Sequence, residues 1–266
     1  MLSSCYRGKS QNTQIDISEV PTHVAVVVPI VGEIPDVLPS PSPSFPVDFG
    51  VVPVSETKTQ IITLINVGPY PASNLKESSS QGLALPFLYK SGTYPGEGGD
   101  CNNIIEASKS CTIVIDYSPT EARISSQTLG LSYVNGVIEV PITFSMKGTT
   151  PAELSLSDGA TYSFGSVAAN TSIDKVFTLT NSGASRASQI ELSSVELLTA
   201  PFTIKGGTYP GVGGTCTGLL DAGSSCTLIV SFSPSSVGDF KSPLVISYHD
   251  SLQIQSIKLS LTGSGN

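Results

Sequence analysis

The residues of this chain that are best placed to do chemistry are its cysteines. Five are present, and four of them form two equally spaced pairs, Cys101 with Cys111 and Cys216 with Cys226. A zinc site would need the closer Cys-x-x-Cys spacing together with histidine ligands, and neither accompanies these pairs. Four cysteines allow three connectivities, and the equal spacing selects one disulfide within each pair. Two such disulfides indicate an oxidising compartment, with free buried thiols as the alternative.

The fifth cysteine, Cys5, stands outside this pattern and follows Leu2, Ser3 and Ser4. The segment resembles a bacterial lipobox, in which an aliphatic residue and two small residues precede the cysteine that receives a lipid. The apolar core of a signal peptide does not precede it in this sequence. Two interpretations stay open, namely lipidation at Cys5, which we favour, and a plain unpaired cysteine near a frayed end. The first predicts a lipoprotein of the bacterial cell envelope, at the outer membrane or cell surface.

Other catalytic or metal-binding patterns are weak. The two histidines are His23 and His249, and the second is followed by Asp250. No nucleophile elbow accompanies them, so we expect His249 to be a solvated turn residue rather than part of a triad. EF-hand, Walker and His-Glu-x-x-His patterns are missing, although calcium held by scattered carboxylates stays open. The sequence therefore predicts a protein that is not an enzyme, without catalytic residues, metal or cofactor.

Charge narrows the choice of partners. The net charge is −8, and only 13% of the residues are charged. Binding to nucleic acid requires clustered lysine and arginine to displace counterions from phosphates, so we expect no nucleic-acid partner. A basic patch for anionic lipid headgroups is missing too, so contact with a membrane is expected only through a lipid anchor.

The cysteine pairs lie in two copies of one segment, offset by 115 residues. The same offset relates Gly50 to Gly165 and Asn66 to Asn181, without insertion or deletion between them. A fixed period of this kind indicates two copies of one domain. We expect three parts: a lipobox-like start and a proline- and serine-rich tether over residues 1–44, and two repeats over residues 45–149 and 150–266.

Alternating apolar residues predict strands in both copies, and no helical period is visible. The expected inward positions are Ile62, Leu64, Ile113, Ile115, Tyr117, Leu129, Leu131, Tyr133, Ile142, Phe144 and Met146, with Phe177, Leu179, Leu228, Val230, Phe232, Leu244, Ile246, Tyr248, Ile257, Leu259 and Leu261 as their counterparts. Gly50 and Gly165 are interpreted as turns after an aromatic residue, and Asn66 and Asn181 as turn residues that end a strand. The prediction is an all-β protein with two tandem immunoglobulin-like antiparallel β-sandwiches.

A run of apolar residues from Val24 to Val31 interrupts the tether. It is too short to span a bilayer, which takes about twenty residues. Leu154 opens the second copy, whereas its counterpart in the first copy is Pro39, so the first copy lacks a normal opening strand. We expect the valine run to fill that sheet edge, with pairing to another protein's edge as the alternative.

The segment between residues 92 and 101, repeated at residues 207–216, is the most conspicuous candidate surface. Its glycines allow close backbone approach, and Tyr94 and Tyr209 offer stacking faces for a sugar or a protein. The alternative is a structural turn whose tyrosine lies over the end of the sandwich. The presence of the loop in both copies favours this alternative. Glu97 and Asp100 are the differences between the copies in this loop and complete the set of candidate ligand-binding residues.

Together these motifs resemble a known family. The pattern DFG…TLxNxG…PF…GGTYPGxGGxC…SCTxxVxFxP…LxxxY…LxGxG, over residues 45–265, resembles the bacterial choice-of-anchor D repeats. These belong with the Hydin-like (ASH-type) immunoglobulin-like domains, relatives of major sperm protein and pilus chaperones. The first copy departs from the pattern at Ser91, Glu97 and Asp100. The resemblance implies a cell-envelope protein with a structural, interaction or adhesive role and brings no catalytic residues.

The function expected from the sequence is therefore a structural or protein-interaction module on a lipid-anchored stalk. Its expected partners are other envelope or surface proteins, met through an exposed sheet edge. A carbohydrate-binding adhesin that uses the two Gly-Thr-Tyr-Pro-Gly loops, with glycans as ligands, is the alternative.

Overall fold

The computed structural model describes residues 28–29, 44–78 and 82–266. The lipidation expected at Cys5, the histidine at position 23 and most of the predicted tether lie outside these residues. The strands of the first repeat are β1 (Val28–Pro29), β2 (Ser44–Val51), β3 (Lys58–Ile65), β4 (Ala72–Glu77), β5 (Phe87–Tyr89), β6 (Ile104–Ile105), β7 (Ser110–Tyr117), β8 (Ser125–Val134) and β9 (Glu139–Thr149), with a 3₁₀ turn, η1, at Lys90–Gly92.

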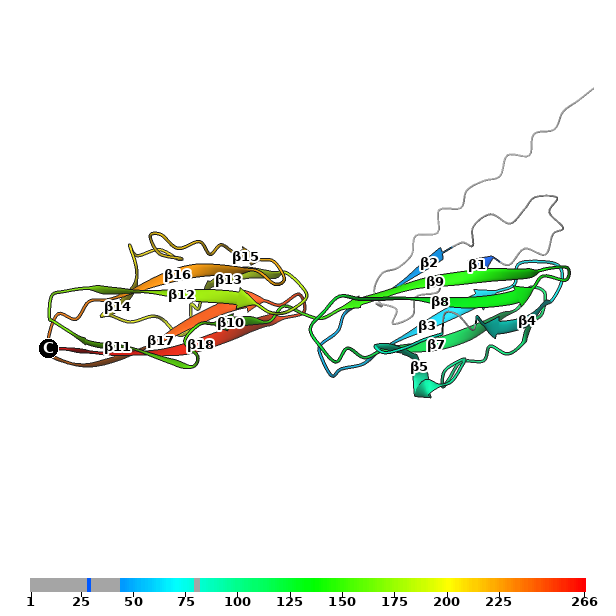
Figure 1. Ribbon diagram of the computed structural model, residues 1–266, viewed down its shortest axis with the longest axis horizontal. Helices are drawn as coiled ribbons and strands as arrows, with labels where there is room; N and C mark the ends of the chain where they lie inside the picture. The colour runs from blue at the N-terminus through cyan, green and yellow to red at the C-terminus, as the bar shows by residue number, and fades with distance from the viewer. Residues whose placement is uncertain (1–27, 30–43, 79–81) are drawn as a thin grey trace, which may run out of the picture.

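The strands of the second repeat are β10 (Leu154–Leu156), β11 (Thr161–Val167), β12 (Ile173–Asn181), β13 (Ala187–Leu192), β14 (Phe202–Ile204), β15 (Leu219–Leu220), β16 (Ser225–Phe232), β17 (Gly238–His249) and β18 (Ile254–Gly265). Each repeat is a sandwich of one four-stranded and one five-stranded sheet. The sheet orders are β1-β3-β7-β5 with β2-β9-β8-β4-β6, and β10-β12-β16-β14 with β11-β18-β17-β13-β15. The fold is therefore all-β and immunoglobulin-like, and Figure 1 shows the two sandwiches joined end to end.

Most strand pairs of the sandwiches are antiparallel, as predicted, and the opening strands add parallel pairs. β10 is antiparallel to β12, whereas β11 pairs in parallel with β18, and β2 pairs in parallel with β9. In the second repeat the reason is that the opening strand crosses from one sheet to the other without reversing direction. It therefore enters the second sheet parallel to that sheet's last strand.

The valine run supplies the missing edge of the first repeat. Val28 lies opposite Leu64 and Pro29 opposite Ile65, so β1 occupies the place next to β3 that β10 occupies next to β12. This confirms the predicted pairing within the chain for these two residues, although β1 is parallel to its neighbour, whereas β10 is antiparallel. The rest of the run lies outside the described residues.

Gly50 and Gly165 do not form turns, which corrects the sequence interpretation. They lie inside β2 and β11, with φ angles of +67° and +73°, where the ladder register shifts. A glycine at positive φ inside a strand makes a bulge, which changes the direction of the next side chains. Phe49 and Phe164, the residues just before the bulges, are buried in their cores.

The predicted inward positions form the two cores. All are buried except Ile257, which is partly buried against the second core. At the centre of the first core the rings of Phe87 and Tyr117 stack with centroids 4.8 Å apart. The equivalent rings of the second core, Phe202 and Phe232, stack at 4.7 Å. Equivalent positions of the two repeats therefore form equivalent cores.

Candidate functional site: the disulfide-bonded loops and the domain junction

The structure pairs the cysteines as the repeat predicts. Cys101 is bonded to Cys111 and Cys216 to Cys226, each with Cα atoms 4.8 Å apart. All four cysteines are buried as members of the two cores. Each disulfide therefore fastens one end of a glycine-rich loop to the strand that follows it, β7 or β16.

Each loop lies along an edge of the sheet that would otherwise be open. β5 pairs with β7 only from Ile115 to Tyr117, and the loop covers the preceding part of β7. The Val114 N–H donates to the Pro95 carbonyl at 2.8 Å, and the Asp100 N–H donates to the Thr112 carbonyl at 3.1 Å. An open strand edge invites pairing with other chains, so these loops act as edge covers.

The two tyrosines of these loops face the protein rather than solvent. Tyr94 and Tyr209 are half-buried and pack against the two cores. The Tyr94 ring meets the Tyr89 ring edge-on, with centroids 5.5 Å apart. Both hydroxyl oxygens are buried without a hydrogen-bond partner among the described residues. A sugar platform needs an exposed ring face, so this geometry favours the structural interpretation of the loops.

Burial raises the pKa of Tyr94 and of Tyr209 to about 12, with the nearby carboxylate of Glu77 adding to the effect at Tyr94. Because the folded pKa lies above the unfolded value of about 10, the neutral phenols stabilise the fold below pH 10. We expect this stability to be lost as the pH rises from 10 to 12. In urea unfolding, the free energy of unfolding of the Tyr94→Phe/Tyr209→Phe double variant should fall less steeply with pH across that range. An unchanged dependence on pH would contradict the role assigned to these two phenols.

The residues that differ between the loops have local partners. The Asp100 carboxylate accepts hydrogen bonds from the Thr112 hydroxyl at 2.8 Å and N–H at 2.6 Å, and these bonds hold its pKa below the usual value. Thr215 has the same role in the second repeat, where its hydroxyl accepts from the Thr227 N–H at 3.0 Å. Asp100 is therefore engaged within its own loop.

Glu97 is paired in the same way. It accepts a hydrogen bond from the Ser91 hydroxyl at 2.8 Å. The counterparts of this pair are Val212 and Gly206, and a methyl group added at Gly206 would lie 2.5 Å from the Val212 side chain. Ser91 therefore occurs with a hydrogen-bonding Glu97 in the first repeat, and Gly206 with the apolar Val212 in the second.

His249 and Asp250 shape the turn between β17 and β18 through hydrogen bonds to its backbone. The His249 Nδ1 accepts a hydrogen bond from the Ser251 N–H at 3.1 Å. The buried Asp250 carboxylate accepts from the N–H groups of Leu252 at 2.7 Å and Gln253 at 2.8 Å. Burial alone would raise the pKa of Asp250, but these bonds hold it below the usual value. Both side chains thus fix the β17–β18 turn.

Within residues 28–29, 44–78 and 82–266, no group of three or more histidine, cysteine, aspartate or glutamate side chains is arranged to hold a metal ion. In that described part of the chain, no helix has the length and apolar character needed to cross a membrane.

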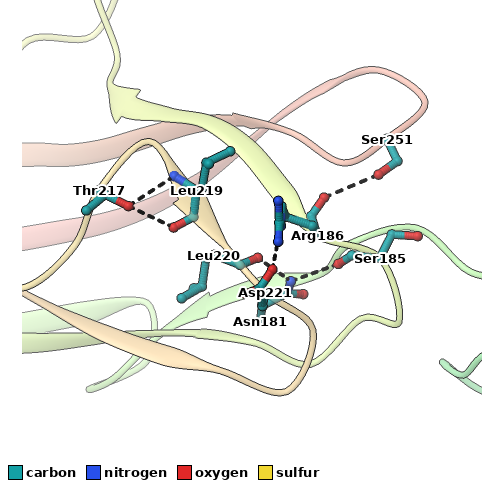
Figure 2. A network of polar contacts seen from close by, with 8 residues as sticks. All are labelled: Asn181, Ser185, Arg186, Thr217, Leu219, Leu220, Asp221 and Ser251. Atoms are coloured by element: carbon teal, nitrogen blue, oxygen red, sulfur yellow. Dashed lines mark hydrogen bonds and ion pairs between the residues drawn. The ribbon is translucent and has the colours of Figure 1, made fainter.

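A buried asparagine organises the end of the second repeat that faces the first. The Asn181 side chain donates to the carbonyls of Ser185 at 2.9 Å and Leu220 at 3.0 Å. Its oxygen accepts from the Gly183 N–H at 3.1 Å and the Glu153 N–H at 3.2 Å. Figure 2 shows this centre beside the Arg186–Asp221 ion pair. The sequence predicts only a turn residue at this position.

The first repeat contains an equivalent buried asparagine that is hydrogen-bonded to the backbone. Asn66 donates to the carbonyls of Tyr70 at 2.8 Å and Ile105 at 2.9 Å, and it accepts from the Gly68 N–H at 3.0 Å. The signal that could have found it is the Asn-x-Gly sequence at the same offset in both copies. A turn alone does not require a buried side-chain amide, yet both repeats have one at this position.

The junction between the repeats is open rather than tightly packed. The linker is attached to the second repeat, because the Ser185 hydroxyl donates to the Thr150 carbonyl at 2.7 Å and the Ala152 N–H to the Asp250 carbonyl at 2.9 Å. Three clefts of about 480, 410 and 330 Å³ lie around this linker, each lined by residues of both repeats.

Comparison with known protein families gives a match in the second repeat. Residues 152–264 match the family model described as HYDIN/CFA65/VesB-like, Ig-like domain. The match agrees with the Hydin-like part of the sequence resemblance and indicates a structural or interaction module. The choice-of-anchor D and lipoprotein assignments stay predictions. No curated protein sequence matches the chain.

Several solved structures are similar at low identity. The ASH/PapD-like domain 7 of human CEP192 is 17% identical, over 44% of this chain and 87% of that one, with a TM-score of 0.33. The VesB protease of Vibrio cholerae is 19% identical over 42% of this chain and 31% of that one, at 0.32. Titin domains I67–I69, in an E-to-A variant, are 9% identical over 84% and 64%, at 0.38. The aligned region spans about a third of the VesB protease, and these likenesses carry no information about function.

A disulfide variant tests how much the loop closure contributes. We expect the Cys216→Ala/Cys226→Ala double variant to lower the free energy of unfolding of the second repeat by about 2.5–3 kcal/mol, the chain-entropy value for so short a loop. Urea unfolding of the oxidised wild type and of the variant measures this difference. The Cys101→Ala/Cys111→Ala variant is the matched control and should lower the stability of the first repeat by a similar amount. A loss under about 1 kcal/mol in both would contradict the assigned role.

Proposed function

We propose that the protein is a non-enzymatic interaction module of the bacterial cell envelope, displayed outside the cytoplasm at the outer membrane or cell surface. In this proposal a lipid on Cys5 anchors the chain, and the tether of residues 1–44 holds the two sandwiches away from the membrane. The observation that carries the proposal is the disulfide in each repeat, closing the same edge-covering loop. Disulfides of this kind persist in oxidising compartments and are rare in a reducing cytosol.

The partners proposed for the module are other envelope or surface proteins. One route is pairing along a strand edge, because β10 covers β12 only from Leu179 to Asn181. The uncovered part of β12 carries Lys175, whose ammonium group forms an ion pair with Asp158 at 2.7 Å and lies over the Tyr162 ring. A charge on an edge strand discourages pairing with another strand. The ends of the sandwiches are therefore better candidate surfaces than this edge.

An intact mass of the protein purified from its native envelope, before and after reduction, tests the proposal. We expect an acylated chain that begins at Cys5 and gains four hydrogens on reduction, the signature of two disulfides. An unmodified chain with five free thiols would overturn both the anchor and the compartment. A chain with two disulfides and no lipid would keep the compartment and remove the anchor.

A further inference from the structure

The C-terminal end of the second repeat carries a surface that the first repeat uses at the junction. This surface, the C-terminal pole, consists of residues 163–166, 237–241 and 262–264. It is hollowed by a cleft of about 500 Å³, whose lining includes Ser163, Gly165, Phe240 and Lys241. Val237 stands beside the cleft with 78% of its surface exposed. Figure 1 shows this end of the second sandwich free of the first.

The same positions of the first repeat line a cleft at the junction. Shifted by 115 residues, Ser163, Gly165 and Lys241 correspond to Asp48, Gly50 and Ser126, and Gly263 corresponds to Gly148. Seven of the nine residues that line the C-terminal cleft have their counterparts in the 480 Å³ junction cleft. These counterparts are Asp48, Gly50, Val51, Ile124, Lys147, Gly148 and Thr149.

The opposite wall of that junction cleft belongs to the second repeat. It is made by residues 184–186, in the β12–β13 turn, and by Ser251, in the β17–β18 turn. The geometry of the junction is therefore a template, in which the pole of one repeat faces these two turns of the next repeat. On the second repeat the same pole faces no described residue of the chain.

The first repeat carries the matching turns at its end away from the junction. This surface, the N-terminal pole, consists of residues 66–71 and 135–138, the counterparts of the turns that line the junction. It exposes apolar side chains, with Tyr70 64% and Val137 68% exposed. The corresponding residues of the second repeat are Ser185 and Leu252. An exposed apolar patch on turns that have an interface role elsewhere in the chain indicates a contact surface.

Charge does not oppose contact between the two poles. Beside the N-terminal pole the exposed residues Glu106 and Lys109 supply one charge of each sign, and the C-terminal pole exposes Asp239 and Lys241. Each surface is therefore close to neutral, and the chain's net charge of −8 is spread over the rest of the molecule. Opposite charges are also available on both sides to select a register.

We propose that the N-terminal pole of one copy docks on the C-terminal pole of a second copy, so that the chains associate head to tail by repeating their own junction. The two surfaces differ, so the contact is heterologous and can extend into open rows of molecules. No linker joins the partners, and end-to-end contacts between sandwiches are small, so the association is weak in dilute solution. This inference rests on the proposed role as an interaction module and names its partner.

Sedimentation velocity of the oxidised full chain, from about 10 μM to about 1 mM, tests the proposal in the range expected of a weak interface. We expect the weight-average mass to rise with concentration, through dimers to longer species. Val137→Arg blocks the N-terminal pole, and Val237→Arg blocks the C-terminal pole. Each variant alone should remain monomeric. Both positions are exposed, so thermal unfolding should stay as in the wild type. Val195→Arg, 87% exposed on the connection between β13 and β14, is the matched control and should associate normally.

Mixing the two pole variants separates this arrangement from a symmetric dimer. Each variant retains the pole that the other lacks, so an equimolar mixture should form a one-to-one dimer and stop there. Association of Val237→Arg alone, or of Val137→Arg alone, would show a symmetric contact and overturn the proposal. A wild-type chain that stays monomeric with both disulfides intact would also overturn it, while leaving the envelope role standing. Missing disulfides or lipid would instead count against the envelope role.

Discussion

Replacing Asn181 by alanine should lower the free energy of unfolding of the second repeat by about 4 kcal/mol. The substitution leaves two carbonyls and two N–H groups around the site without their partner. Each buried polar group left unpaired costs about 1–3 kcal/mol, and water entering the cavity recovers part of the total. The loss is measured by urea unfolding of the full chain, followed by circular dichroism and fitted with a separate transition for each repeat.

Two variants make the test specific. Asn181→Asp keeps the oxygen that accepts from Gly183 but sets a second oxygen against two carbonyl oxygens, so it should be at least as destabilising as alanine. Ser182→Ala removes an exposed hydroxyl that donates to the Glu153 carbonyl at 3.2 Å and should change stability by under about 1 kcal/mol. If Asn181→Ala costs no more than Ser182→Ala, the asparagine is not the centre of this turn.

The matching variant of the first repeat should have a smaller effect. Asn66 makes three of these hydrogen bonds in the described residues, and Asn181 makes four. Asn66→Ala should therefore destabilise the first repeat by about 3 kcal/mol. A larger effect at Asn66 than at Asn181 would contradict the ranking.

The core could be predicted from the sequence because alternation along a strand records which face is buried. Ile62 and Leu64 and their counterparts Phe177 and Leu179 are fully buried, as the parity indicates. Ile257 is the exception, because it is only partly buried against the second core, whereas its counterpart Ile142 is buried. The disulfides could be predicted because the repeat imposes the same connectivity twice.

Features that depend on contacts distant in sequence could not be predicted in this way. The parallel pairing of β11 with β18 requires knowing that the opening strand changes sheets, which local alternation does not encode. The roles of Tyr94 and Asp100 depend on what lies opposite them on β5 and β7. The sequence identified these loops as the most conspicuous surface, but it did not show that their glycines face a strand.

Those glycines provide the second large effect that we predict. Gly96 has a φ angle of +91°, and a methyl group there would lie 2.1 Å from the carbonyl oxygen of Val114. Gly98 has a similar φ of +86°, but a methyl group there would meet nothing within 4 Å. Alanine at either position incurs the backbone strain of positive φ, about 1–2 kcal/mol. Only alanine at Gly96 must also separate the loop from β7.

Gly96→Ala should therefore destabilise the first repeat by about 4 kcal/mol or more, and Gly98→Ala by about 1–2 kcal/mol. The difference isolates the close approach of the loop to β7, because both variants share the strain of positive φ. Separation of the loop would break the hydrogen bond from the Val114 N–H to Pro95 and expose an edge that the disulfide alone cannot cover. We therefore expect Gly96→Ala, unlike Gly98→Ala, to aggregate on mild warming.

The second repeat offers the same comparison with a milder contact. A methyl group at Gly211 would lie 2.7 Å from the Ile229 carbonyl oxygen, and one at Gly213 would lie 3.5 Å from the Ile229 side chain. The order of effects in urea unfolding should be Gly96→Ala, then Gly211→Ala, with Gly98→Ala and Gly213→Ala smallest. Equal losses at all four positions would mean that positive φ alone keeps glycine in these loops. The predicted order would instead show that the loops keep glycine because their backbone lies directly against the strand, where they cover its edge.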